Sequence, residues 1–129
     1  MTTLTYDGTT VVLPPDLLWM DEFAWQGVEQ SREYTSTGAL VIEEFAMQAG
    51  RPITLQGGVD YAWCLRSELT TLNTWARVAG AQLTLNLHGV DRDVVWDHGG
   101  GAVRADPIVP YSDPLPGDPY SLTLKFVEV

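Results

Sequence analysis

Residues 67–80 contain the one stretch of the chain with a convincing helical pattern, and most of what surrounds it alternates like β-strands. Ser67 is expected to cap the first helical turn and Gly80 to end the helix. Threonine and asparagine, which are weak helix formers, occupy much of the interior, so the helix needs a sheet to hold it. The face that would pack on this sheet comprises Leu69, Leu72, Trp75, Ala76 and Ala79.

The residues around this helix predict about eight short strands. The clearest are residues 82–88 and 120–126, in which apolar and polar side chains alternate regularly. Asp7-Gly8 lies between two strands expected within residues 4–13, and His88-Gly89 follows residues 82–87; both dipeptides are typical of tight turns.

Glycine and proline predict irregular structure in two other places. Residues 99–101 are three consecutive glycines and are expected to form a flexible joint. Residues 106–119 hold five of the eight prolines, so they predict an extended loop that stays out of the central sheet.

Residues 23–46 read as a long hairpin with its turn near Gly38. Its base is apolar through Phe23, Trp25, Val41 and Phe45, and this end is expected to pack in the core of the same chain. Its middle and tip are polar and charged.

Together these patterns predict one mainly β (α+β) domain over residues 1–129: a β-sandwich or split barrel of about eight strands, one flanking helix at about residues 67–79 and the long hairpin.

Charge and length exclude several classes of function. The chain has 129 residues, a formal net charge of −10 and only seven scattered basic residues, which argues against a nucleic-acid-binding or anionic-membrane-binding protein. It has no apolar run of about 20 residues, and its first residues resemble no signal peptide. We therefore expect a protein made in the cytosol, without membrane contact.

The residues that could carry chemistry form no established pattern. The densest polar group, His88, Asp91, Asp93, Asp97 and His98, has a spacing that matches no known metal-ligand arrangement and suits solvated turns. Adjacent carboxylates such as Glu43 and Glu44 point to opposite faces of a strand and cannot flank one glycosidic bond. Cys64 lies between Trp63 and Leu65 and reads as a small buried hydrophobe. We expect no enzyme, and no catalytic, cofactor-binding or metal-binding residues.

The aromatic content leaves two interpretations open. The chain has five tryptophans and five tyrosines, and rings exposed on a β-sandwich would stack on sugars, as in a non-catalytic carbohydrate-binding module. The favoured interpretation is that Trp25, Trp63, Trp75 and Trp96 fill the core, because they lie in the apolar phase of their elements.

From Gly38 onward, the order of features resembles small structural proteins of bacteriophage tails, from the tail tip or baseplate and of the distal-tail or tail-tube kind. The resemblance covers about two-thirds of the chain. It is carried by residues 38–42, 50–55, 67–80, 83–89, 105–109 and 120–129. Residues 90–93 depart from the pattern, because they are acidic where a basic and an aromatic residue are expected.

The resemblance implies a β-sandwich with one flanking helix that builds a closed ring around the tail axis, in contact with neighbouring tail proteins and without catalytic residues. Such a protein would be made in the host cytoplasm and reside in the virion tail. DNA would pass through the ring without specific binding, and an acidic surface suits this role because cations facing the channel would hold phosphates.

A two-stranded ribbon is only marginally stable in water. We therefore expect another subunit to cover the hairpin, with Arg32, Tyr34 and Leu40 at or beside the interface.

Overall fold

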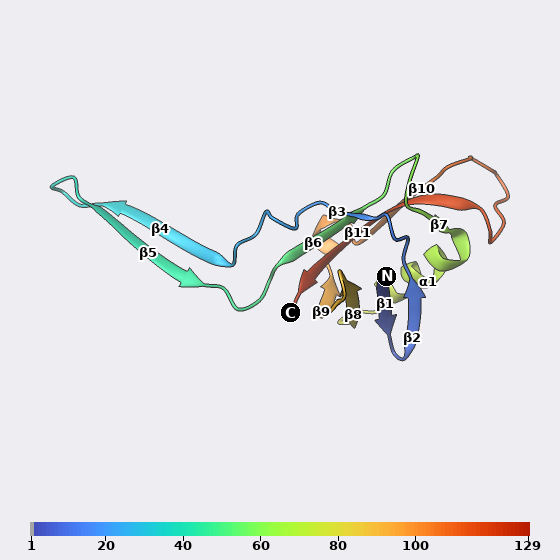
Figure 1. Cartoon of the computed structure of the whole chain (residues 1–129), viewed down its shortest axis with the longest axis horizontal. Helices are drawn as coiled ribbons and strands as arrows, with labels where there is room; N and C mark the ends of the chain where they lie inside the picture. The colour runs from blue at the N-terminus through green and yellow to red at the C-terminus, as the bar shows by residue number, and fades with distance from the viewer. Residues whose placement is uncertain (1) are drawn as a thin grey trace.

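The computed structural model describes residues 2–129, which form eleven β-strands, one α-helix and one 3-10 turn. The prediction of a mainly β domain with one flanking helix and a long hairpin is confirmed (Figure 1). The strands are β1 (Thr3–Tyr6), β2 (Thr9–Val12), β3 (Leu18–Trp19), β4 (Val28–Tyr34), β5 (Leu40–Ala46), β6 (Pro52–Gln56), β7 (Trp63–Leu65), β8 (Gln82–Leu87), β9 (Val90–Trp96), β10 (Val103–Pro107) and β11 (Pro119–Glu128). The helix is α1 (Arg66–Ala76), and the 3-10 turn is η1 (His98–Gly100).

β11 is the strand on which the main sheet is built. Along one edge it pairs first with β10 and then with β9, and along the other edge first with β7 and then with β6. All of these pairings are antiparallel, and the sheet continues from β9 through β8 and β1 to β2, and from β6 to β3. Nine of the strands within residues 2–129 therefore belong to one sheet, which bends around the core like a sandwich that is open at its edges.

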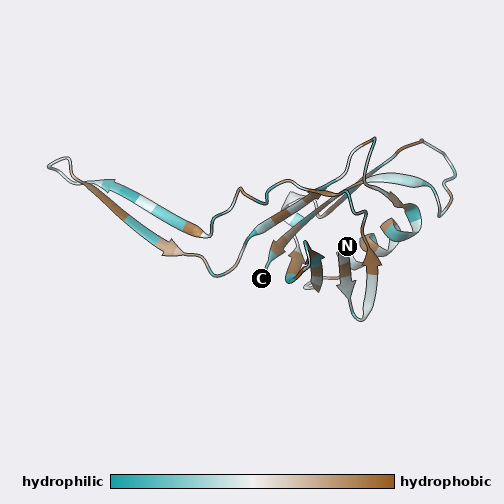
Figure 2. Ribbon diagram, in the orientation of Figure 1, coloured by the Kyte–Doolittle hydropathy of each residue, from teal (hydrophilic) through white to brown (hydrophobic). Residues whose placement is uncertain are grey.

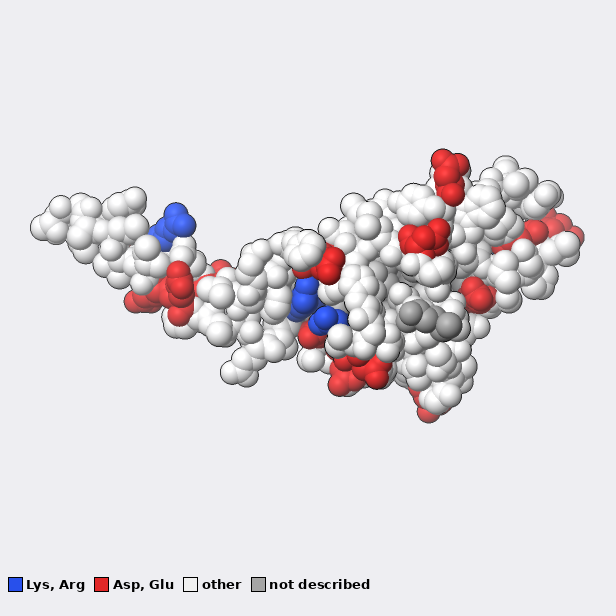
Figure 3. Space-filling view, in the orientation of Figure 1, with Lys and Arg blue, Asp and Glu red and all other residues white. Residues whose placement is uncertain are grey.

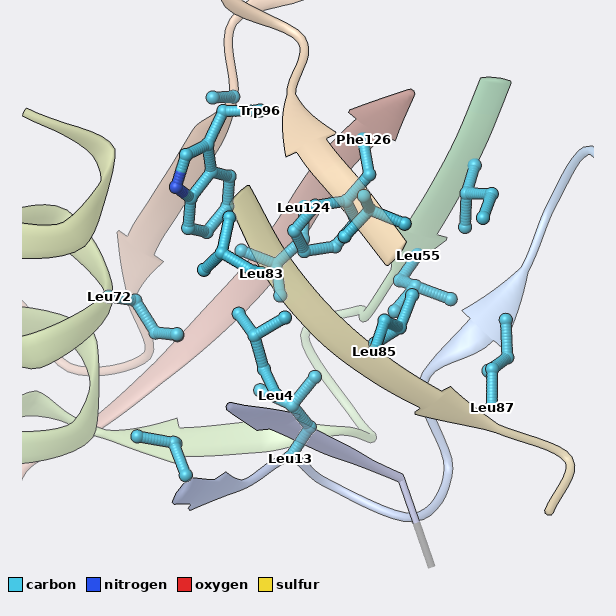
Figure 4. Packing of buried hydrophobic residues seen from close by; sticks show 14 of the residues in the cluster. Leu4, Leu13, Leu55, Leu72, Leu83, Leu85, Leu87, Trp96, Leu124 and Phe126 are labelled. Atoms are coloured by element: carbon cyan, nitrogen blue, oxygen red, sulfur yellow. The ribbon is translucent and has the colours of Figure 1, made fainter. Parts of the chain in front are cut away.

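The core consists of the inward-facing side chains of this bent sheet (Figure 4). Leu83, Leu85 and Leu87 of β8 alternate inward as predicted, and all three are buried. Trp96 of β9 stacks on Phe126 of β11 at 4.8 Å between ring centroids. β11 likewise buries Leu122 and Leu124, and leaves its alternate side chains on the outer face.

The helix covers one end of this core and is anchored by two large side chains. Leu72 and Trp75 are buried, and the Trp75 ring lies 5.8 Å from the ring of Tyr6 on β1. The helix runs from Arg66 to Ala76, so it ends three residues before the predicted limit, and Ala79 is exposed.

The predicted Ser67 cap is wrong, because Leu65 occupies the N-cap position and offers no side-chain hydrogen bond. The first helical amides bind backbone carbonyls from a distant loop instead: Arg66 N donates to Asp118 O and Ser67 N to Pro116 O, each at 3.0 Å. A tertiary contact thus satisfies the amides that a side-chain cap would have served.

Both predicted tight turns are present. Asp7 and Gly8 have φ of 50° and 79°, and His88 and Gly89 have φ of 54° and 78°. Two consecutive positive φ values match the right-handed twist of the flanking strands. β9 begins directly after the second turn, at Val90.

Residues 99–107 differ from the prediction. The glycines after Asp97 form an ordered turn rather than a flexible joint, because the Asp97 Oδ1 accepts a hydrogen bond from Gly100 N at 3.1 Å. Residues 106 and 107 belong to β10, which joins the main sheet through β11, and Pro119 is the first residue of β11 itself, so both ends of the predicted loop join the sheet. A terminal Pro107 is tolerated because β10 is an edge strand, where a missing amide leaves no ladder bond unmade.

Replacing Leu124 with Ala is expected to lower the free energy of unfolding by about 3 kcal/mol, because Leu124 is buried on the strand that all parts of the sheet share. Thr123→Ala, one residue away on the outer face, is the control and is expected to cost less than about 1 kcal/mol. Guanidinium unfolding followed by tryptophan fluorescence measures both. Equal losses in the two variants would contradict the assignment of faces on β11.

Candidate functional site

The hairpin formed by β4 and β5 is a separate two-stranded sheet that projects away from the rest of the molecule (Figure 1). Seven residue pairs join its strands, from Val28 opposite Ala46 to Tyr34 opposite Leu40. All fourteen strand residues are exposed, including Leu40, Val41 and Ile42 on the return strand. The described part of the chain therefore covers neither face of this ribbon.

The hairpin base does not pack in the core, contrary to the prediction. Phe23 is 84% exposed and Phe45 is 61% exposed, while Trp25 is partly buried. The reason is topological. β3 and β6 pair with each other, so the chain leaves the sheet after Trp19 and returns at Pro52, and the apolar residues of the hairpin lie beyond the reach of the core.

The two faces of the hairpin differ in chemistry. Opposed residues of an antiparallel pair share a face, so Tyr34 with Leu40 and Arg32 with Ile42 lie on the same side. The three predicted interface residues therefore share one largely apolar face, and Figure 2 shows apolar residues grouped along β5. Polar side chains on this face bind one another: Arg32 Nε donates to Gln30 Oε1 at 2.7 Å, and Gln30 Nε2 to Glu44 Oε1 at 2.6 Å.

The opposite face of the hairpin is acidic. It carries Glu29, Glu33 and Glu43, with Ser31 between them and Val41 and Phe45 beside them. Within the described residues the side chains of these three glutamates have no hydrogen bond or ion pair. The face thus presents three solvated carboxylates on a ribbon two strands wide.

A cluster of arginine and tryptophan braces the point where the hairpin meets the body. The Arg51 guanidinium lies 4.6 Å from the Trp19 ring centroid and 6.0 Å from that of Trp25, and its Nη2 donates to the backbone oxygen of Glu22 at 2.6 Å. A second guanidinium, that of Arg92, lies 5.3 Å from the Trp19 ring. Figure 3 shows basic side chains gathered where the hairpin joins the body.

Backbone and carboxylate contacts complete this brace. The Asp21 carboxylate accepts hydrogen bonds from Thr54 N at 2.8 Å and from Thr54 Oγ1 at 3.1 Å. Gly50 N donates to Glu128 O, and Glu128 N donates to Arg51 O, each at 2.9 Å. Both chain segments that lead to the hairpin are therefore fixed to the main sheet, while the hairpin itself stands free.

The histidine and aspartate residues weighed as a metal site do not form one cluster. His88 and His98 lie at opposite ends of the seven-residue β9, about 23 Å of strand apart. His88 instead faces Glu22 at 3.5 Å, and Asp91 accepts a hydrogen bond from Asn86 at 2.8 Å. No group of three His, Cys, Asp or Glu side chains capable of holding a metal ion occurs within residues 2–129.

Cys64 is buried on β7, as expected of a small hydrophobe. Burial, with a contribution from the charge of Glu68, raises the pKa of its thiol to about 11. The thiolate, which is the nucleophilic form, is therefore scarce at neutral pH.

The prediction that the tryptophans fill the core is correct for Trp75 and Trp96. It is wrong for Trp25, which is partly buried at the hairpin base outside the core cluster, and for Trp63, which is 48% exposed. Its indole nitrogen donates to Val59 O at 2.7 Å. Trp63 and Tyr61 line an open hollow together with Asp16 and Asp60. The loop that carries them is closely packed, because a side chain at Gly58 would collide with the Tyr61 ring.

Comparison of the chain with protein-family models, with curated proteins and with solved structures gives no significant match. Residues 2–129 include no helix with the length and apolar character needed to cross a membrane.

Sequence reasoning missed the brace at the hairpin base. Arg51 lies in a Gly-Arg-Pro turn, and Trp19 in a short apolar connector. Neither pattern shows that the two side chains meet. The available signal was Arg51 itself, a basic residue directly before a strand in a chain with only seven basic residues.

Replacing Arg51 with Ala is expected to lower the free energy of unfolding by about 1–2 kcal/mol, because the ring contacts and the bond to Glu22 O are lost. Amide hydrogen exchange is expected to rise selectively in residues 20–27 and 47–51. Arg77→Ala, which removes an exposed arginine at the end of α1, is the control. Equal exchange in the two variants would show that Arg51 does not hold the hairpin base.

Proposed function

We propose that this protein is a structural component of a bacteriophage tail tip or baseplate, and that copies of it form a closed ring around the tail axis. The observation that carries the proposal is the projecting hairpin. A two-stranded ribbon with both faces in water is marginally stable, and this one exposes Tyr34, Leu40 and Ile42 on a single face. Such a ribbon is explained if a neighbouring subunit or tail protein covers it.

The remaining features agree with this role. The order of strands, helix and terminal strand resembles that of phage tail proteins, which work in the virion after synthesis in the host cytoplasm. The net charge of −10 suits a ring through which DNA passes without specific binding. The role requires no enzymatic activity, cofactor or membrane contact.

The hairpin face that carries Arg32, Tyr34 and Leu40 is the proposed contact surface. Tyr34→Ala and Leu40→Ser are each expected to reduce incorporation into particles, measured as copies per purified virion. Tyr34→Ala is expected to change the free energy of unfolding by less than about 0.5 kcal/mol, because the ring is exposed in the single chain. Tyr111→Ala and Leu115→Ser, which alter exposed residues outside the hairpin, are the matched controls.

Two outcomes would contradict the proposal. One is normal assembly of Tyr34→Ala particles, since the interface would then lie elsewhere. The other is a single copy of the protein per virion, or none, since a closed ring needs several.

A second candidate function, non-catalytic carbohydrate binding at the host surface, is favoured by the hollow at Tyr61 and Trp63. Exposed rings offer a stacking surface, and the Asp16 and Asp60 carboxylates beside them can accept hydrogen bonds from hydroxyl groups. If this function holds, glycan binding will saturate and Trp63→Ala will abolish it, while Tyr111→Ala leaves it unchanged. Glycan-array and fluorescence titrations measure both. An array without binding would contradict the carbohydrate-binding function and leave the ring as the remaining proposal.

A further inference from the structure

The outer face of β10, β11 and β6 carries two basic side chains, Arg104 and Lys125. Arg104 of β10 lies opposite Thr123 of β11, and Lys125 is two residues further along the same face of β11. Residues on one face of a strand are about 7 Å apart. Within the described residues neither side chain takes part in a side-chain hydrogen bond or an ion pair. In a chain with a net charge of −10, this face is an exception.

The same face forms a shallow polar hollow. Hydroxyl and amide side chains from three adjacent strands line it beside the two cations. Its lining residues are Thr54, Gln56, Arg104, Asp106, Ser121, Thr123 and Lys125. Asp106 is at one end, and at the other the Asp21 carboxylate already accepts two hydrogen bonds from Thr54. The hollow therefore presents two basic side chains and many hydrogen-bonding groups, but little apolar surface.

The acidic face of the hairpin complements this hollow. Glu29, Glu33 and Glu43 form a triangle of carboxylates, with Ser31 between Glu29 and Glu33 and opposite Glu43. On β4 the acidic stretch runs from Glu29 to Glu33, and on β11 the hollow runs from Ser121 to Lys125; each is four residue steps, about 13 Å, so the two lengths match. Stacked sheets lie about 10 Å apart, which leaves room for arginine, lysine and glutamate side chains to meet between them.

The hairpin cannot reach the hollow of its own chain, because it projects away from the body and both of its connecting segments are fixed to the main sheet (Figure 1). We propose that the acidic face of the hairpin binds the β10–β11–β6 hollow of a second copy of this chain, with Glu29, Glu33 and Glu43 facing Arg104 and Lys125. The contact joins two different surfaces, so each copy can give one hairpin and receive another, and the series closes into a ring when the rotation permits. The inference rests on the proposed function, and it names the surface that receives the hairpin.

The experiment exchanges the charges of the two surfaces in the full chain. The first variant carries Glu29→Lys and Glu33→Lys, and the second carries Arg104→Glu and Lys125→Glu. A third chain carries all four changes. The control carries Arg77→Glu and Asp113→Lys, both at exposed positions outside the two surfaces. Sedimentation velocity across chain concentration and salt measures self-association, and circular dichroism checks folding.

The wild type and the control are expected to self-associate, and more weakly at high salt because salt screens exposed charges. Each two-residue variant alone is expected to associate roughly tenfold more weakly or worse, because like charges then face each other. Mixing the two variants restores association, since each hairpin then finds a hollow of opposite charge. The chain with all four changes restores it without mixing.

Three outcomes would overturn the inference: a wild type that is monomeric at the highest soluble concentration, variants that associate like the wild type, or a weakened pair that mixing does not restore. The virion experiment tests the proposed function separately from this contact. If Tyr34→Ala particles assemble normally and the charge exchange succeeds, the contact between copies stands and the proposed tail interface is wrong. If virions contain many copies of the chain but charge exchange has no effect, the proposed function stands and this contact is wrong.

Discussion

Strand pairing along β11 is the constraint on which the rest of the structure depends. This one strand binds β10 and β9 along one edge and β7 and β6 along the other, so it joins the two halves of the bent sheet. Its alternation divides inside from outside: Leu122, Leu124 and Phe126 complete the core, and Ser121, Thr123 and Lys125 form the outer hollow. The strand that stabilises the fold therefore also builds one of its candidate binding surfaces.

The hairpin, by contrast, contributes nothing to the core. Residues 20–51 leave and rejoin the sheet between β3 and β6, which are paired neighbours, and no residue of this excursion is buried in the core. The brace of Arg51, Trp19 and Asp21 fixes where it leaves the body. Stability of the single chain therefore explains the brace but not the ribbon beyond it. The proposed contact with another molecule would account for the composition of that ribbon.

The sequence predicted what local patterns control. Regular alternation of apolar and polar residues predicted β8 and β11. Dipeptides that readily adopt positive φ predicted the turns at Asp7-Gly8 and His88-Gly89. The misses depend on contacts between distant residues. The helix begins without the Ser67 cap because carbonyls of Pro116 and Asp118 bind its first amides, and β10 forms because β11 offers it an edge. Of the candidate site, the hairpin was predictable, but the register that places Arg32, Tyr34 and Leu40 on one face, the brace and the outer hollow were not.

An exposed ribbon with apolar residues is a hazard as well as a contact surface, because its free edges can pair with other chains. Here charged residues interrupt every apolar run: Glu43 and Glu44 follow Ile42, and Arg32 and Glu33 precede Tyr34. Charges of this kind oppose unspecific strand pairing, yet they can also be met by opposite charges on one particular surface. The same glutamates can therefore keep the free chain apart from wrong partners and, in the proposed ring, select the right one.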